Sequence, residues 1–87
     1  MVVGVLFDGV GSQEHYEQVL NEVMPNGERA PGLLSHHAGP SENGFCVIET
    51  WESPEALQRF FEERLGQALA RANIQGQPTI FQVINSL

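Results

Sequence analysis

The sequence is short of positive charge. It contains no lysine and only four arginines, against eleven aspartates and glutamates, so the formal net charge of its 87 residues is -7. Proteins hold nucleic acids by setting cationic side chains against phosphates, and anionic membrane surfaces attract proteins in the same way. We therefore expect no nucleic acid and no membrane among the partners of this chain.

Cysteine and long apolar runs are also scarce. Cys46 is the one cysteine, which excludes a disulfide within the chain and suits a reducing compartment. No stretch approaches the roughly 20 apolar residues that a membrane-spanning helix needs. Residues 1–8 lack the basic start and long apolar core of a signal peptide. These absences predict a cytoplasmic protein.

Four segments have the pattern of β-strands. Residues 2–7 and 79–85 are apolar on both alternating sets, which is typical of strands covered on both faces, and the first should be central in its sheet. Residues 33–38 and 45–51 form two further candidate strands, joined by a turn at 39–44 that is rich in Gly and Pro. The middle pair is therefore expected to form a hairpin.

Two segments are expected to be helices. The first is capped by Ser12 and stopped by Pro25, and the second is capped by Ser53 with Pro54 at its first position. Gly66 interrupts the second and predicts a kink or a break. The expected apolar stripes comprise Tyr16, Val19, Leu20, Val23 and Met24 in the first helix, and Leu57, Phe60, Phe61, Leu65, Ala68, Leu69 and Ala72 in the second.

The order βαββαβ predicts an α+β, ferredoxin-like fold, with a four-stranded antiparallel sheet and both helices on one face. A chain of this length forms one domain, 1–87. Since two helices cannot cover both faces, apolar residues would remain exposed on the other face. A second copy can cover them by pairing the two sheets as a dimeric α/β barrel. A homodimer is therefore expected.

This element order, with Trp51-Glu52-Ser53-Pro54-Glu55-Ala56 leading into the second helix, resembles the dimeric α/β-barrel superfamily, in its antibiotic-biosynthesis-monooxygenase-like branch. The resemblance implies a homodimer with a ligand cleft between the sheet and the helices. Members of the superfamily include cofactor-free monooxygenases acting on aromatic polyketides, haem-degrading enzymes, polyketide cyclases and proteins with no known activity. On this resemblance no cofactor is expected.

Two departures narrow the resemblance. Counting from Trp51, the helix Trp of the haem-degrading relatives falls at Phe60, and their haem-ligating His falls at Ala70. The cyclase-like members place a Tyr at the Phe60 position and a His six residues later, where this chain has Gly66. Neither haem degradation nor cyclase chemistry is therefore expected.

His36 and Glu49 are the candidate catalytic pair. If the hairpin turn is centred between Ser41 and Glu42, His36 opposes Val47, and Glu49 is its diagonal neighbour on the same face, about 7 Å away. In this register Leu34 shares that face and Leu33 the other, although a bulge would change the partners. Glu49 could then hold the imidazole in one tautomer, so that His36 acts as a general base on a phenolic or enolic proton.

Aromatic residues near this pair are candidates for ligand binding. A planar ligand could stack among them, the Tyr16 hydroxyl could orient it, and Asn85 could hydrogen-bond it. The candidate ligand-binding residues are Trp51, Phe45, Tyr16, Phe60 and Asn85. The alternative is that these aromatics are ordinary core, that Asn85 is a strand-end residue, and that His36 and Glu49 are a sheet histidine and a charge at the cleft mouth.

No metal site is predicted. His36 and His37 are adjacent on a strand and point to opposite faces, and His15 lies on a helix with no ligand four residues on. Two functional hypotheses remain. The first is a homodimer that binds a small aromatic or hydrophobic molecule and acts as a cofactor-free monooxygenase or isomerase. The second is a non-catalytic dimerisation or ligand-sequestering module.

Overall fold

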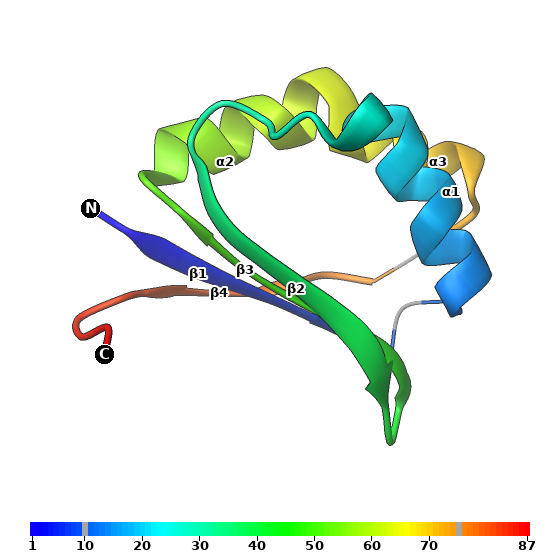
Figure 1. Cartoon of the computed structure of the whole chain (residues 1–87), viewed down its shortest axis with the longest axis horizontal. Helices are drawn as coiled ribbons and strands as arrows, with labels where there is room; N and C mark the ends of the chain where they lie inside the picture. Colours follow the sequence, from blue (N-terminus) through cyan, green and yellow to red (C-terminus); the bar gives the residue numbers. More distant parts are fainter. Residues whose placement is uncertain (10, 75) are drawn as a thin grey trace.

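The computed structural model describes residues 1–9, 11–74 and 76–87, and its elements follow the βαββαβ order. The elements are β1 (Val3–Asp8), α1 (Gln13–Val23), the 3-10 turn η1 (Pro25–Gly27), β2 (Leu33–Ser41), β3 (Gly44–Trp51), α2 (Pro54–Phe60), the π-helical turn η2 (Phe61–Leu65), α3 (Gly66–Arg71) and β4 (Thr79–Gln82). The strands pair antiparallel in the order β2-β3-β1-β4, and the helices lie on one face of the sheet (Figure 1). The predicted ferredoxin-like α+β fold is confirmed.

The core lies between the sheet and the helices. As its two-sided apolar pattern predicts, β1 is an inner strand, paired with β3 on one side and β4 on the other. Trp51, at the end of β3, is fully buried, and its ring packs against that of Phe60 with centroids 5.0 Å apart. The buried cluster also contains Val3, Val5, Val19, Val23, Met24, Ala30, Leu33, Leu65 and Ala68.

Both predicted helix starts are confirmed. The hydroxyl of Ser12 accepts a hydrogen bond from the backbone N–H of His15 at 3.3 Å, and that of Ser53 accepts one from Ala56 at 3.1 Å. Each bond satisfies one backbone donor that has no partner within the first turn of its helix. These caps fix where each helix leaves the sheet.

The break expected at Gly66 takes the form of a π turn. At the end of η2 the N–H of Gly66 bonds to the carbonyl of Phe61, and a Cβ on Gly66 would lie 3.1 Å from that oxygen. Glycine therefore suits this close approach. Phe61 was expected in the buried stripe, and this was wrong, because Phe60 takes the core position against Trp51 and leaves Phe61 45 % exposed.

The β2–β3 hairpin is tighter than predicted. Its strands run to Ser41 and from Gly44, so the turn has two residues rather than the six at 39–44. Gly39 and Pro40 suggested a loop, but Pro40 is tolerated because β2 is an edge strand with a neighbour on one side only. The register consequently moves by two residues from the predicted one.

A bulge at the start of β2 also reverses two predicted positions. Leu33 pairs with Trp51, whereas Ser35 already pairs with Thr50, so Leu34 is the extra residue. Leu33 is therefore buried and Leu34 is 48 % exposed. The prediction that Leu34 shares the His36 face was wrong for this reason.

The last strand is shorter than the predicted 79–85. It ends at Gln82, and the bond from the N–H of Val83 to the carbonyl of Val2 is its last backbone contact with the β1 side. Beyond it the chain runs free of the sheet (Figure 1). Asn85 lies in this exposed tail.

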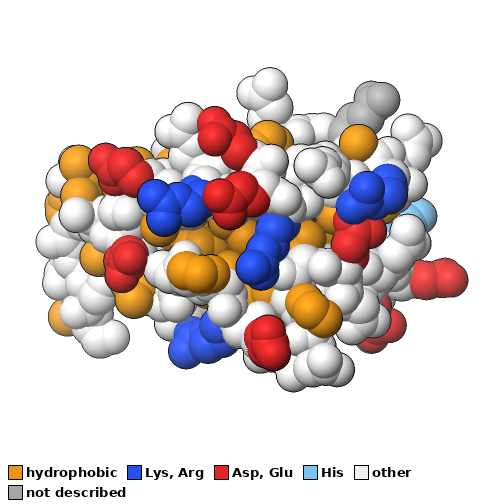
Figure 2. Space-filling view, turned by 90° about the horizontal axis from the view of Figure 1, so that it is seen from above, with side chains coloured by type: hydrophobic (Ala, Val, Ile, Leu, Met, Phe, Trp, Pro, Cys, Tyr) orange, Lys and Arg blue, Asp and Glu red, His pale blue; other side chains and the backbone are white. Residues whose placement is uncertain are grey.

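Charges of both signs are mixed on the helix face of the molecule. Figure 2 shows Arg side chains standing among acidic ones around a seam of apolar side chains. One such pair joins α1 to α3, because the Arg71 guanidinium donates to the Glu22 carboxylate. Among the described residues, none of the helices has the length and hydrophobicity that crossing a membrane requires.

Candidate active site

The hairpin sets His36 of β2 directly opposite Glu49 of β3. The predicted register made them diagonal neighbours and was wrong, since the turn is centred between Glu42 and Asn43. The move by two residues keeps the alternation of faces, so both side chains still point towards the helices. The predicted proximity of the two groups is thus observed with a different pairing.

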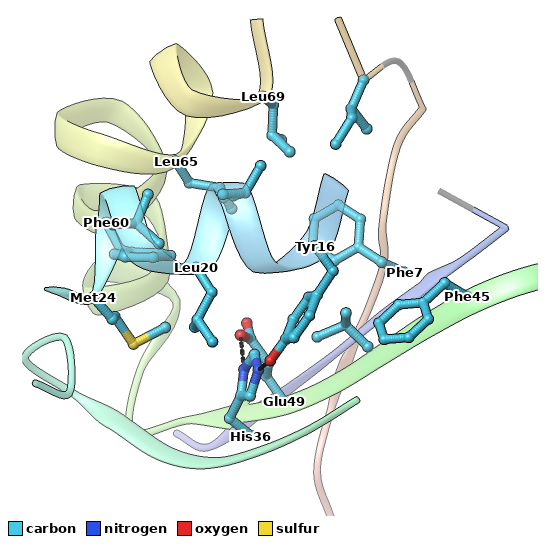
Figure 3. Close-up of a pocket in the computed structure, with 14 residues that line it drawn as sticks. Phe7, Tyr16, Leu20, Met24, His36, Phe45, Glu49, Phe60, Leu65 and Leu69 are labelled. Carbon is cyan, nitrogen blue, oxygen red and sulfur yellow. Dashed lines mark hydrogen bonds and ion pairs between the residues drawn. The ribbon is translucent and has the colours of Figure 1, made fainter. Parts of the chain in front are cut away.

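Four side chains form one hydrogen-bonded chain. The indole N–H of Trp51 donates to Glu49 Oε1 at 3.0 Å, and Glu49 Oε2 lies 2.6 Å from His36 Nδ1. The other ring nitrogen of His36, Nε2, lies 2.5 Å from the hydroxyl of Tyr16 on α1. Figure 3 shows the two bonds at His36 as dashed lines, with Tyr16 reaching down from α1 to the sheet.

The direction of these bonds follows from the chemistry of the groups. An ionised carboxylate only accepts hydrogen bonds, so Nδ1 of His36 carries the proton that is donated to Glu49. Nε2 is then the lone-pair nitrogen and accepts from the Tyr16 hydroxyl. The arrangement resembles the carboxylate–imidazole–hydroxyl order of nucleophilic triads, with a phenol in the place of the serine.

Burial keeps this chain of groups ordered. Glu49 is 6 % exposed and Trp51 is fully buried, whereas the His36 side chain is 20 % exposed. Burying a carboxylate is costly unless its oxygens have partners, and both oxygens of Glu49 have one. The polar groups therefore form a satisfied cluster inside an apolar surrounding.

Tyr16 is held as a neutral phenol. Burial, with a smaller contribution from the charges of Glu49 and Glu17, raises its pKa above the usual value of a tyrosine. Its ring stacks on that of His36 with centroids 5.7 Å apart and lies 5.1 Å from that of Phe45. At neutral pH the hydroxyl is therefore a proton donor to His36.

A small cavity of about 70 Å³ lies beside these groups, and we call it the inner cavity. Tyr16, His36 and Glu49 form its polar end, and the rest of the wall is apolar, as Figure 3 shows. Its lining residues are Phe7, Tyr16, Val19, Leu20, Val23, Met24, His36, Phe45, Val47, Glu49, Phe60, Leu65, Leu69 and Ile74. An apolar chamber with a few convergent polar groups is the usual form of a small-molecule site.

The structure brings together most of the predicted site residues. His36, Glu49, Tyr16, Phe45 and Phe60 all line the inner cavity. Trp51 does not line it and lies behind Glu49, where it acts through its N–H. Asn85 lies in the exposed tail, away from this group.

Two features of the site were missed by the sequence reasoning. The contact between Tyr16 and His36 joins a helix to a strand 20 residues away, and no local pattern reports such a contact. The bond from Trp51 to Glu49 was available in principle, because residues two apart on a strand point to the same face.

Metal ligands are not gathered at this site. Within residues 1–9, 11–74 and 76–87, no group of three or more His, Cys, Asp or Glu side chains is placed to hold a metal ion. The polar end of the inner cavity consists instead of one imidazole, one carboxylate and one phenol. Such a set can move a proton and bind a neutral hydroxyl group.

Comparison with solved structures finds the same fold in several bacterial proteins. A proposed antibiotic biosynthesis monooxygenase of Deinococcus radiodurans is 18 % identical, with 100 % of this chain and 96 % of that chain covered and a TM-score of 0.68. SnoaB of Streptomyces nogalater, a cofactor-independent oxygenase, is 19 % identical, with 99 % and 95 % covered and a TM-score of 0.68. At these identities the likeness shows the fold alone.

Among curated proteins none matches the chain significantly. The family model of antibiotic biosynthesis monooxygenases, however, matches residues 10–72, which is most of the chain and includes α1, the hairpin and the second helix. The predicted kinship is thereby confirmed, and the chain belongs to the antibiotic biosynthesis monooxygenase family.

Proposed function

We propose that the protein is a cofactor-free monooxygenase of a small hydroxylated aromatic or hydrophobic molecule. The observation that carries this proposal is the buried chain of hydrogen bonds from Trp51 through Glu49 and His36 to the Tyr16 hydroxyl, ending at an apolar cavity. The likeness to a protein described as a cofactor-independent oxygenase is consistent with it. No cofactor is part of the proposal.

The proposed first step is a proton transfer. A ligand hydroxyl at the polar end gives its proton to the Tyr16 oxygen as Tyr16 passes its own proton to Nε2 of His36. The imidazolium that forms is stabilised by the carboxylate of Glu49, which Trp51 holds in place. Glu49 and Trp51 are thus positioning residues, and His36 is the base that Tyr16 connects to the ligand.

The resulting anion is electron-rich enough to react with dioxygen directly. The ligand itself is the reductant: a ring CH₂ group and O₂ become a C=O group and H₂O, so one oxygen atom enters the ligand and the other leaves as water. An isomerase would share the proton transfer but return the proton to another carbon, without consuming O₂. The two outcomes differ in product mass.

The experiment uses anthrone, whose enol tautomer is hydroxyanthracene, as the probe. We expect oxygen uptake and a product heavier by one oxygen and lighter by two hydrogens. His36→Ala should lower kcat/KM by about 10²–10⁴-fold, the usual contribution of a positioned base. The particle mass should be retained, and the melting temperature should fall because Glu49 Oε2 loses its hydrogen-bond partner. If His36→Ala changes stability alone, the catalytic proposal is wrong.

A non-catalytic, ligand-sequestering module is the second candidate. It is favoured by one observation: among the described residues, no buried side-chain nitrogen or oxygen lacks a hydrogen-bond partner. The four polar groups thus satisfy one another without a ligand. For this candidate we expect anthrone to bind without turnover, and Tyr16→Phe and His36→Ala to alter affinity or stability only.

We also propose that the protein is a homodimer, with residues 1–87 forming one half of a barrel. The face of the sheet that the helices leave open carries Ile48, which is 48 % exposed, and Phe81, which is 49 % exposed. Leu6 pairs with Ile48 and shares this face. A second sheet packed on it would remove these side chains from water.

Light scattering tests the dimer. We expect a particle of twice the 9.6 kDa of one chain, and half that mass for Ile48→Asp, which would bury an unpaired charge in the pairing face. A wild-type particle of one chain over the micromolar range would contradict the proposed dimer.

We also propose a cytoplasmic location, since a reducing environment keeps the half-buried Cys46 as a free thiol.

A further inference from the structure

A second and larger hollow lies next to the inner cavity. It has a volume of about 950 Å³ and runs between the second helix and the β1–β4 side of the sheet, and we call it the outer groove. Val5 of β1 and Ile80 of β4 form its floor, and Leu57 and Phe61 stand on its helix side. Ile80 and Phe61 are about half exposed, so the groove is open to solvent.

The two hollows have a wall in common. Phe7, Leu65, Leu69 and Ile74 line both of them, and we call these four residues the shared wall. Leu69 is only partly buried, whereas Leu65 belongs to the buried core. Leucine side chains change rotamer without moving the backbone, and partly exposed ones do so fastest.

Neither hollow is sufficient as a site by itself. Sites for drug-sized molecules occupy about 300–1,000 Å³; the outer groove lies in that range, and the inner cavity lies far below it. The titratable groups have the opposite distribution, since the inner cavity holds Tyr16, His36 and Glu49. Among the described residues that line the outer groove none is titratable, and its polar side chains are the amides Gln58, Asn73 and Gln77.

The geometry points to one divided site, an assignment that rests on the proposed function. The bulk of the ligand lies in the outer groove, and its hydroxyl-bearing end reaches Tyr16 and His36 when the side chain of Leu69 turns away from the shared wall. The ligand class follows from the linings. It is an uncharged, elongated and largely apolar ring system, with a phenolic or enolic hydroxyl at its leading end and neutral carbonyl or hydroxyl groups that the amides bind.

Leu69 is therefore a residue that determines which ligands enter. While its side chain closes the wall, the apparent affinity for a ligand that spans both hollows is reduced by the fraction of molecules that are open. Minor states of this kind are populated at about 0.1–10 %. Removing the side chain should tighten binding of a spanning ligand about tenfold, if about 10 % of the molecules are open.

The test compares Leu69→Ala with Leu57→Ala, since Leu57 is also partly buried but lines the outer groove alone. Binding of phenol, naphthol and hydroxyanthracene is measured without oxygen, through the fluorescence of Trp51, the chain's one tryptophan. Because Trp51 bonds to Glu49, a ligand that reaches the polar end alters this fluorescence. We expect Leu69→Ala to bind hydroxyanthracene about tenfold more tightly, and Leu57→Ala to bind it more weakly through loss of a contact.

Whether Leu69→Ala binds hydroxyanthracene more tightly or more weakly than the wild type decides between a divided site and a groove that binds alone. If the outer groove binds the ligand alone, Leu69→Ala loses a contact just as Leu57→Ala does, and both variants bind more weakly. That result, or saturation of the groove with unchanged Trp51 fluorescence in every variant, overturns the assignment. Leu69→Val, which shortens the side chain less, repeats the comparison should Leu69→Ala fold poorly.

Binding and turnover separate this inference from the proposed function. The fluorescence assay needs no reaction, so a protein that never oxidises anthrone can still show the divided site. Conversely, if turnover falls in His36→Ala and binding weakens in Leu69→Ala, the proposed chemistry is supported and the divided site is rejected.

Discussion

Replacing Glu49 with Gln tests the centre of the site with almost no change of shape. Both partners of Glu49 are donors, Trp51 Nε1–H and His36 Nδ1–H, whereas a glutamine amide offers one acceptor and one donor side. The indole cannot reverse its bond, so the imidazole must. We expect His36 to move its proton to Nε2, which then faces the Tyr16 oxygen as a donor and no longer as a base.

The expected loss of unfolding free energy follows from the two hydrogen bonds of Glu49 that change. Hydrogen bonds to a charged group contribute about 1.5–3 kcal/mol each and neutral ones about 0.5–1.5 kcal/mol, so two exchanges cost about 2–3 kcal/mol. Removing a carboxylate that is 6 % exposed returns part of its desolvation cost. A net loss of about 1–2 kcal/mol in unfolding free energy remains. For a domain of this size it lowers the melting temperature by about 5–15 °C.

Two measurements check this prediction. Nitrogen NMR of the histidine side chains distinguishes the two tautomers, and the spectrum of His36→Ala identifies the signals of His36 among the three histidines. Melting is compared at one protein concentration, because the melting temperature of a dimer depends on it. Oxidation of anthrone should fall by about 10²–10⁴-fold, since the base is blocked.

Glu42→Gln is the control, because it removes one negative charge as Glu49→Gln does, but from a residue that is exposed in the hairpin turn. It should leave the His36 signals and the melting temperature unchanged. An unaltered Nδ1 proton and wild-type melting in Glu49→Gln would refute the reasoning, since they would mean that the carboxylate does not set the tautomer.

Three further predictions concern other parts of the chain. Tyr16 is the one tyrosine, so tyrosinate absorbance should report Tyr16 alone, with a pKa above the usual value of about 10. The stability that Tyr16 contributes is complete below about pH 10 and is lost as the pH rises through its higher folded pKa. The chain has no lysine that would titrate in the same range, and Tyr16→Phe should not show this loss in alkaline melting curves. Ser53→Ala removes a helix cap and should cost about 1 kcal/mol in urea unfolding, a loss that Ser53→Asp should largely avoid. Gly32→Ala should cost about 1–3 kcal/mol, since Gly32 has φ +91 and a Cβ there would lie 2.5 Å from that of Ala56; an unchanged urea midpoint would contradict this.

The parts of the fold that were predictable are those with a local physical cause. Ser12 and Ser53 cap helices because short polar side chains can bond the free donors of a first turn, and this depends on neighbouring residues only. The inner position of β1 followed from a strand that is apolar on both sides. Element order and type therefore needed no knowledge of packing.

The errors lie where tertiary structure overrides a local signal. Pro40 suggests a loop, yet it fits an edge strand because no neighbour needs its missing N–H. The bulge at Leu34 depends on which of two adjacent leucines packs under Trp51. The same holds for the site, since the bond between Tyr16 and His36 exists only once α1 has docked on β2.

The π turn η2 carries one residue more than a regular α-helix would need to join the same two ends. Deleting a single codon between Phe61 and Arg64 would therefore give a regular α-helix that joins the same two ends and leaves Leu69 on its cavity-facing side. The same deletion between Gly66 and Leu69, where the helix is already regular, would turn the residues after it by about 100° about the helix axis and carry Leu69 away from the cavity. The π turn is thus the place where the gene can lose a codon and keep its ligand chamber.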